Sequence, residues 1–160
     1  MATQTLDTAD ELLHFQLRTA LTMEDDSLAA LAVLEKAAKS AKVKKMFSHH
    51  ADETKEQIEN LKKVFDLLDL KQTTAPSPST KGISKQAESL IQRAAPSLQD
   101  QVVLASALGN EHYEIASYEA LLVPVTKMGL SDAAALLQAN LEQETHTSEE
   151  LKAELERMAA

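Results

Sequence analysis

Hydrophobic residues recur along most of the chain at alternating spacings of three and four, which is the period of an amphipathic α-helix. The first such run begins behind Thr8 and Glu11, whose T-x-x-E spacing is typical of an N-terminal capping box, and it ends near Ser40. A second run restarts almost at once and continues to Leu68. Because the connection between the runs is short, we expect two helices that lie side by side and antiparallel.

This periodicity is lost at residues 71–84, where Pro, Ser, Thr and Gly are concentrated. Such a composition predicts an extended crossover rather than a domain boundary. A short helix around residues 85–94 is expected to follow it.

Two further long helices are predicted after this segment. The third long helix should run from Pro96 to Gly129, a glycine placed as a helix C-cap. Ser131 should cap the fourth, whose apolar seam continues to Met158. Two helical hairpins joined by one long crossover are the connectivity of a ferritin-like four-helix bundle, although an up-down bundle with a long second loop would give the same pattern.

Composition supports an all-α fold built as one domain. The chain has 160 residues, of which 44% are hydrophobic, and it contains only 3 Gly, 4 Pro and 3% aromatic residues. The good helix formers Ala, Leu, Glu, Lys and Gln dominate it. We therefore interpret residues 1–160 as a single all-α domain, a length that suffices for a substantial core.

Charge and residue usage exclude several classes of function. The chain has no cysteine, which excludes disulfides and thiolate-bound metals. Its net charge of −9 and the shortness of its basic run at residues 42–45 argue against nucleic-acid binding. We also expect no membrane-spanning segment and a cytoplasmic location, because no apolar stretch is long enough to cross a bilayer and no signal peptide opens the sequence.

The third predicted helix carries the segment GNEHYEIASYEAL, residues 109–121, with two acids on its apolar stripe. Glu111 and Glu114 lie one turn apart, so both carboxylates should face the bundle interior. A buried, unpaired carboxylate is costly or becomes protonated, and two adjacent ones also repel each other. Between residues 97 and 128 the only Lys or Arg is Lys127, so this pair needs a cation from elsewhere.

The other long helices also bring candidate metal ligands to their apolar stripes. These are Glu24 on the first, His50, Glu53 and Gln57 on the second, and Glu144 on the fourth. Carboxylates combined with an imidazole suit iron or manganese, and also zinc, whereas magnesium and calcium would not need the histidine. Any one such residue is more often ion-paired or partly exposed, and only their coincidence on every helix predicts a metal site. His49, His112 and His146 lie off the stripes and are not expected to be ligands.

These segments resemble the YciE/YciF-type ferritin-like proteins, a family of stress-associated proteins and candidate ferroxidases. The stretches that carry the resemblance are ELLHFQLRTALTME, FSHHADETKEQIENLKKVF, GNEHYEIASYEAL and AAALLQANLEQET. The resemblance implies a ferritin-like bundle, a homodimer, and a site for two metal ions, with iron as the main candidate and O₂ or peroxide as the reactant. The positions it implies as ligands are Glu24, Glu53, Glu111, Glu114 and Glu144, with His50 and Gln57 close to the site.

The sequence departs from the usual di-metal pattern in two respects. Ferritin-like di-iron proteins carry Glu-x-x-His on two helices, whereas here the second helix reads His50-x-x-Glu53 and the fourth Glu144-x-x-Thr147. The family also tends to carry an Asp where this chain has Ser148. Three hypotheses remain: a non-haem di-iron or mixed-metal oxidase, which we favour, a catalytically idle metal-binding protein, and a metal-free helical interaction protein.

Overall fold

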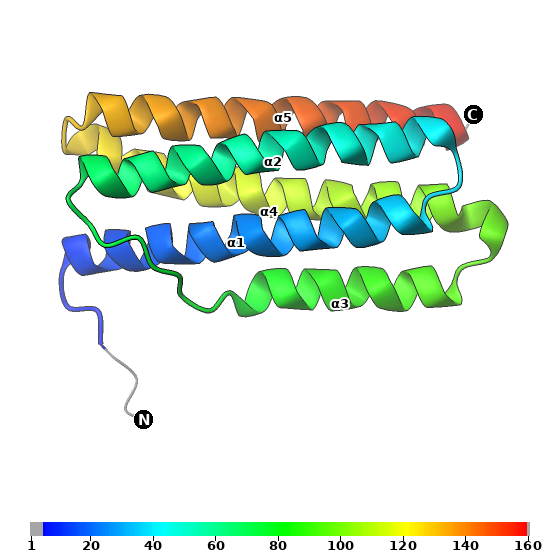
Figure 1. Cartoon of the computed structure of the whole chain (residues 1–160), viewed down its shortest axis with the longest axis horizontal. Helices are drawn as coiled ribbons and strands as arrows, with labels where there is room; N and C mark the ends of the chain where they lie inside the picture. The colour runs from blue at the N-terminus through cyan, green and yellow to red at the C-terminus, as the bar shows by residue number, and fades with distance from the viewer. Residues whose placement is uncertain (1–4, 160) are drawn as a thin grey trace.

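The computed structural model describes residues 5–159, and within this range every regular element is a helix (Figure 1). The elements are α1 (Ala9–Ala37), α2 (Ala41–Leu67), α3 (Pro78–Arg93), the 3-10 turn η1 (Pro96–Leu98), α4 (Gln99–Lys127) and α5 (Ser131–Ala159). The predicted all-α fold, with four long helices and one shorter helix, is confirmed.

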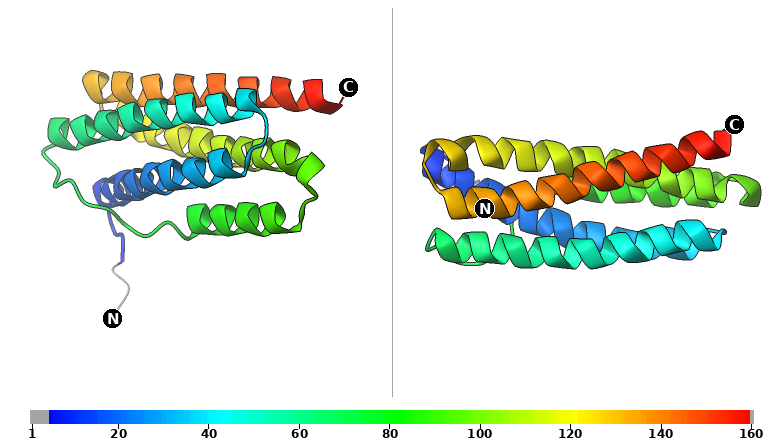
Figure 2. Two further views of the ribbon diagram at one scale, coloured as in Figure 1. Left: turned by 45° about the vertical axis from the view of Figure 1, so that its right-hand side comes forward. Right: turned by 90° about the horizontal axis from the view of Figure 1, so that it is seen from above.

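The long helices form two antiparallel hairpins, α1 with α2 and α4 with α5 (Figures 1 and 2). After α2 the chain returns along the bundle through α3 before α4 begins, so α2 and α4 run in the same direction (Figure 1). An up-down bundle would place them in opposite directions. The up-down alternative is therefore wrong, and the ferritin-like connectivity with a long crossover is confirmed.

Two predicted helix-end signals are present. Thr8 Oγ1 accepts a hydrogen bond from the Glu11 N–H (3.1 Å), and Glu11 Oε2 accepts one from the Thr8 N–H (3.0 Å), which completes the capping box. After α4, Gly129 has a φ of 71°, and the Leu130 N–H donates to the carbonyl of Val125 (3.2 Å). This is a Schellman ending, in which glycine adopts the left-handed conformation without steric cost.

The crossover is shorter than the composition predicted. α3 begins at Pro78 rather than near residue 85, so the extended segment ends at Ser77 and not at residue 84. Proline has the φ of a helix and lacks the N–H that the first turn leaves unbonded, so it suits the start of a helix as well as a loop. The Pro-Ser-Thr composition did not distinguish between the two.

Two other boundaries are corrected. Pro96 opens the separate turn η1, and α4 begins at Gln99. Asp100 accepts hydrogen bonds from the backbone N–H groups of residues 39 and 40 (2.6 and 3.0 Å), so its carboxylate fixes the connection between α1 and α2. Ser131 is the first residue of α5 rather than its cap, a shift of one position.

Hydrogen bonds attach the crossover to α1. The Ala75 N–H donates to the carbonyl of Arg18 (3.2 Å), and the Thr22 hydroxyl donates to the carbonyl of Ala75 (2.6 Å). Further along, the Thr80 hydroxyl donates to Asp26 Oδ2 (2.7 Å). These bonds place α3 against α1 and α4 at one end of the bundle (Figure 2).

Two apolar clusters fill the interior and are separated by a layer of buried polar residues. On α1 the first cluster lies within residues 13–23 and the second within 31–34, and on α4 they lie within residues 118–125 and 103–107. The buried polar residues between them are Glu24, Ser27, His50, Thr54, Gln57, Glu111, Glu114, Asn140, Glu144, Thr147 and Ser148. The bundle thus places its most polar side chains near its middle.

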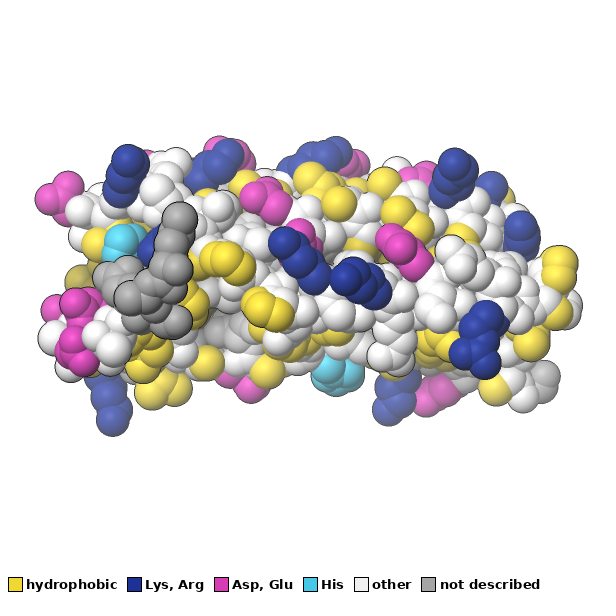
Figure 3. Space-filling view, turned by 90° about the horizontal axis from the view of Figure 1, so that it is seen from below, with side chains coloured by type: hydrophobic (Ala, Val, Ile, Leu, Met, Phe, Trp, Pro, Cys, Tyr) yellow, Lys and Arg dark blue, Asp and Glu magenta, His cyan; other side chains and the backbone are white. Residues whose placement is uncertain are grey.

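The surface carries mixed side chains. On the face seen in Figure 3, acidic and basic side chains are interspersed and apolar side chains lie between them. Over residues 5–159, none of the helices combines the length and the apolar character that crossing a bilayer requires.

Candidate metal centre

Four side chains with metal-binding groups, from three helices, converge in the polar layer. They are His50 on α2, Glu111 and Glu114 on α4, and Glu144 on α5, and one ligand atom from each lies within 4.8 Å of the others. All four residues are buried, with exposed fractions between 0% and 3%. Glu111 and Glu114 are one helical turn apart, so the α4 stripe directs both carboxylates inward, as predicted.

The imidazole of His50 contacts carboxylates through both of its nitrogens. Its Nε2 lies 2.9 Å from Glu111 Oε1 and 3.9 Å from Glu144 Oε2, and its Nδ1 lies 3.4 Å from Glu53 Oε2. The Thr147 hydroxyl donates to the same Glu53 oxygen (3.3 Å). The ring is therefore held between α4 and the rim of the site on α2 and α5.

Glu24 supplies the α1 side of the polar layer and is fully buried. The Tyr118 hydroxyl donates to Glu24 Oε1, and Asn140 Nδ2 donates to the Tyr118 oxygen (3.0 Å). Asn140 Nδ2 also donates to the backbone carbonyl of Gln57 (3.1 Å). This chain of bonds fixes one oxygen of Glu24 and leaves Oε2 without a partner.

The polar layer contains more buried acceptors than donors. Six carboxylate oxygens are buried without a hydrogen-bond partner, and they belong to Glu24, Glu111, Glu114 and Glu144. Among the residues that the structure describes, the ion pairs of these acids are formed with His50 alone. Uncompensated buried carboxylates are costly, so this donor set fits a bound cation well.

Burial raises the pKa of three of these acids. Removal from water, reinforced by the charges of Glu24 and Glu111, raises the pKa of Glu114 well above its usual range. Burial also raises the pKa of Glu144, and the neighbouring charges on α4 add to this effect. For Glu24, burial raises the pKa to about 8, although the hydrogen bond from Tyr118 opposes the shift.

The pKa shifts of His50 and Glu53 favour the charged forms of both side chains, and so an ion pair between them. Burial lowers the pKa of His50, but the hydrogen bond and the charge of Glu111 outweigh burial and raise this pKa to about 10. The hydrogen bond from His50 lowers the pKa of Glu53. These shifts favour a positively charged His50 and the protonated forms of Glu24, Glu114 and Glu144, and binding of a metal ion would release such protons.

The remaining predicted residues lie around this group. Glu53 is at the rim, with 17% of its side chain exposed, and contacts His50 rather than joining the group of four. Gln57 is fully buried, and neither atom of its side-chain amide has a partner. His49 and His112 are exposed, in agreement with their position off the stripes.

Sequence reasoning assigned no role in the site to Asn140 and Thr147, two residues that organise it. A signal existed for both, because Asn140 precedes Glu144 by four residues and Thr147 follows it by three, which places both on the stripe of α5. Polar residues on an apolar stripe are as informative when they are neutral as when they are charged.

The structure therefore defines a ferritin-like four-helix bundle with a buried carboxylate and histidine cluster that can hold a metal ion. Residues 8–160 match the family described as "Domain of unknown function (DUF892)". The chain is 30% identical over 144 residues to Protein YciF of Escherichia coli K12, a match that covers 89% of this chain and 87% of that protein. It belongs to this YciE/YciF-type family.

Solved structures give the same result. The crystal structure of the Escherichia coli stress protein YciF has a TM-score of 0.89 at 29% identity, covering 94% of this chain and 96% of that one. YcfI from Rhodopseudomonas palustris, described as a candidate structural protein, has a TM-score of 0.90 at 28% identity, covering 95% and 98%. A protein from Xanthomonas campestris shares the fold, with a TM-score of 0.74 at 22% identity over 95% and 94% of the two chains.

Proposed function

We propose that this protein is a ferritin-like carboxylate protein that binds redox-active metal ions, iron foremost, at the cluster in its polar layer. The observation that carries the proposal is the set of six buried carboxylate oxygens without partners. A cation is the species that would satisfy them together, because the protein places no Lys or Arg against them within its described residues. The ligands would be His50, Glu111, Glu114 and Glu144, with Glu24 and Glu53 completing the set on either side.

The donor set favours a transition metal of intermediate hardness. Carboxylate oxygens with one imidazole nitrogen suit iron and manganese, and zinc also accepts them. Iron in such a setting supplies one-electron redox chemistry, in which electrons pass from Fe²⁺ to O₂ or peroxide. We therefore propose a ferroxidase or peroxide-consuming role, which agrees with the description of the related Escherichia coli protein as a stress protein.

The residues of this chain have separable tasks in that role. His50 offers a ring nitrogen and, when no metal is present, a positive charge next to Glu111. Tyr118 and Asn140 fix the orientation of Glu24 by hydrogen bonds. The apolar clusters on either side keep bulk water away, which strengthens the electrostatic interactions at the cluster.

A catalytically idle metal-binding role is the second candidate, and one observation favours it. The pattern Glu-x-x-His would place a histidine at position 147, where Thr147 instead contacts His50 and Glu53. The site is thus short of one nitrogen ligand, and the relative YcfI is described as a candidate structural protein. A metal-free interaction protein is the third candidate, for which the same cluster would stay protonated.

Assembly as a homodimer in the cytoplasm is part of the proposal. The family resemblance supports the dimer, and α1 exposes large apolar side chains, among them Leu12 (46%) and Phe15 (39%). Light scattering coupled to gel filtration should give twice the mass of the 17.4 kDa chain.

Two measurements on protein purified without chelator test the proposal and separate its candidates. Elemental analysis should find at least one transition-metal ion per chain, and a content far below this after reconstitution would leave the metal-free role. Addition of Fe²⁺ should consume O₂ or peroxide, and metal binding without consumption would select the idle role. The variant Glu111→Gln should lose metal, whereas the exposed Glu119→Gln on the same helix should retain it.

A further inference from the structure

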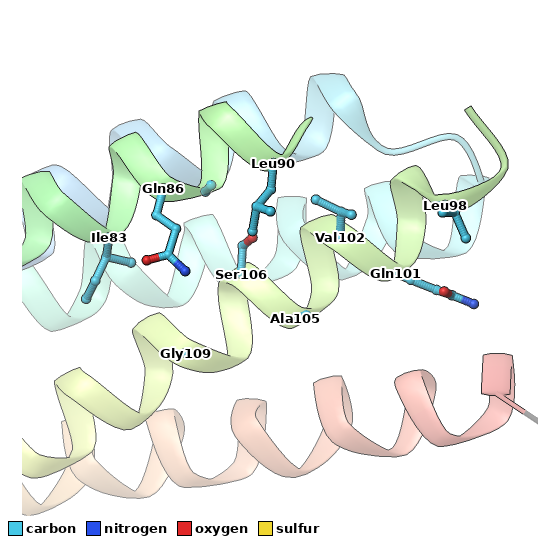
Figure 4. A pocket seen from close by; sticks show the side chains of 10 residues that line it. Ile83, Gln86, Leu90, Leu98, Gln101, Val102, Ala105, Ser106 and Gly109 are labelled. Carbon is cyan, nitrogen blue, oxygen red and sulfur yellow. The ribbon is translucent and has the colours of Figure 1, made fainter. Parts of the chain in front are cut away.

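A groove between α3 and α4 forms the outer end of a passage toward the cluster. The groove has a volume of about 520 Å³ and no charged side chain in its lining. Figure 4 shows Ile83 and Leu90 of α3 pointing toward α4, and Ser106 of α4 pointing back toward α3. Ser106 thus stands where the two helices face each other.

A second, much smaller cavity adjoins this groove and continues inward. It lies among α1, α3 and α4, and it shares Ile83, Ala87 and Ser106 with the groove. Its lining also includes Asn110 and Glu111, so it extends from the shared residues to an acid of the cluster. The linings of the groove and the cavity together therefore extend from the surface beside α3 to Glu111.

The small cavity has the size of one water molecule. Its volume is about 20 Å³, and a single water needs roughly 10 to 15 Å³ by the same kind of measure. Apart from Glu111, its lining is uncharged and consists of apolar side chains, hydroxyls and one amide. A hydrated divalent cation is too large for it, and a bare cation would lose most of its solvation there. Water fits by size and charge, and O₂ and H₂O₂ are also uncharged and only slightly larger, so small movements of the lining side chains suffice to admit them.

Two polar groups mark the narrow part of the passage. Ser106 Oγ is buried without a hydrogen-bond partner, so it is free to pair with a small polar molecule in transit. Asn110 Nδ2 donates to Ser27 Oγ (3.1 Å), which joins α4 to α1 at the inner end of the cavity beside Glu111. Opening this bond would widen the connection to the cluster.

We propose that the passage from the α3–α4 groove, past Ser106 and the Asn110–Ser27 bond, admits small uncharged molecules such as O₂ and H₂O₂ to the cluster and excludes cations. This inference rests on the proposed function, since it assigns an access route to that site. Cations reach the cluster from the opposite side, where Glu53 is partly exposed and contacts His50.

Kinetics with nitric oxide as an uncharged diatomic probe test the route. In stopped-flow mixing with the Fe²⁺-loaded protein, Ser106→Leu should fill the junction and slow NO association at least tenfold, with the same iron content and final absorbance. The control is Ser117→Leu. Ser117 lies 11 residues further along α4, about 20° around the helix from Ser106, and lines a separate groove of about 310 Å³ with no residue of the cluster. The rate of NO association with Ser117→Leu should equal that of the wild type.

A second variant, with the opposite expected effect on the NO rate, distinguishes a blocked passage from misfolding. Asn110→Ala removes the bond to Ser27 and should speed NO association at least twofold. Loading of the metal-free proteins with Co²⁺, followed by visible absorption, should proceed at the wild-type rate in all three variants. Equal NO rates in every protein would overturn the passage, and a slowing of Co²⁺ loading by Ser106→Leu that matches the slowing of NO would overturn its selectivity.

Crystals of the metal-free protein pressurised with krypton provide a readout that does not depend on metal. A krypton atom should occupy the cavity beside Ser106 in the wild type and be absent in Ser106→Leu. A wild-type cavity without gas would contradict the passage. If the wild type binds no metal, the proposed function fails, while the krypton result still decides whether the passage exists.

Discussion

His50 Nε2 lies 2.9 Å from Glu111 Oε1, so a polar contact in the interior joins α2 of the first hairpin to α4 of the second. Both residues are buried, and the contact lies between the two apolar clusters. Apolar packing alone tolerates small shifts of one helix along another, whereas this contact has a defined geometry. We infer that it sets the register of the hairpins as well as the shape of the site.

Replacement of His50 by Ala should lower metal affinity at least tenfold, because the variant loses a nitrogen donor and the group that orients Glu111. Titration with Fe²⁺ under anaerobic conditions, followed by calorimetry, measures the affinity. The control is His146→Ala, which removes an exposed histidine that pairs with the exposed Glu150 and should leave affinity unchanged. Equal affinities of both variants would assign His50 a purely structural role.

Stability of the metal-free protein should fall as the pH rises. The folded-state pKa of Glu24 is about 8 against an ordinary value of 4.5, and that of His50 is about 10 against 6.5. Both pKa values are raised, so between the ordinary and the folded-state pKa of each group the folded chain binds more protons than the unfolded chain. Stability is therefore lost as the pH rises through these ranges. The melting temperature should therefore decrease from about pH 5 to about pH 9, and less steeply in Glu24→Gln. A melting temperature independent of pH would show that neither group is shifted.

The sequence predicted the burial of Glu24, Glu111, Glu114 and Glu144 but not their hydrogen-bond partners. Glu111 and Glu114 stood out because helical periodicity placed them on a buried face with no basic residue within reach, an argument that needs only local geometry. Tyr118 is 94 residues from Glu24, and which phenol meets which carboxylate depends on how α1 packs on α4. Periodicity assigns a side chain to a face but does not determine the rotation of one helix against another.

The same difference between local pattern and tertiary contact explains which parts of the fold were predicted. The hairpins followed from short connections, and Gly129 marked the end of α4 through its conformational freedom. The start of α3 at Pro78 was missed because its anchors, the bonds from Thr80 to Asp26 and from Thr22 to Ala75, join residues more than fifty positions apart. Composition reports local preference, and here contacts with α1 decided between loop and helix.

Tyr118→Phe should destabilise the metal-free protein by about 1 to 3 kcal/mol, because it removes the donor to Glu24 and the acceptor for Asn140 while the apolar ring is retained. Urea unfolding monitored by circular dichroism measures the loss. Tyr113→Phe, on the same helix and only partly buried, is the matched control and should change stability by less than about 0.5 kcal/mol. Equal effects of the two substitutions would contradict a structural role for the Tyr118 hydroxyl.

Glu114→Gln should act in opposite directions with and without metal. Both oxygens of Glu114 are buried without partners, and its pKa is raised by burial and by the charges of Glu24 and Glu111. In the metal-free protein at neutral pH, folding must either bury the charge of Glu114 or bind a proton there, and an amide of the same shape avoids both costs, so the variant should melt at a higher temperature than the wild type. In the presence of metal, the amide is a weaker donor, so the variant binds less tightly and gains less stability from binding.

The measurement that establishes this crossover is a set of four thermal melts, of wild type and variant, each with chelator and with Fe²⁺ under anaerobic conditions. Fe²⁺ should raise the melting temperature of the wild type more than that of the variant. The order of the two melting temperatures should therefore reverse between chelator and Fe²⁺. Glu119→Gln, an exposed acid on α4, removes the same charge and should shift neither melt. A variant that melts lower than wild type in both conditions would mean that Glu114 stabilises the fold without a cation. Unchanged melting temperatures in both would show that its carboxylate is not confined to the buried cluster.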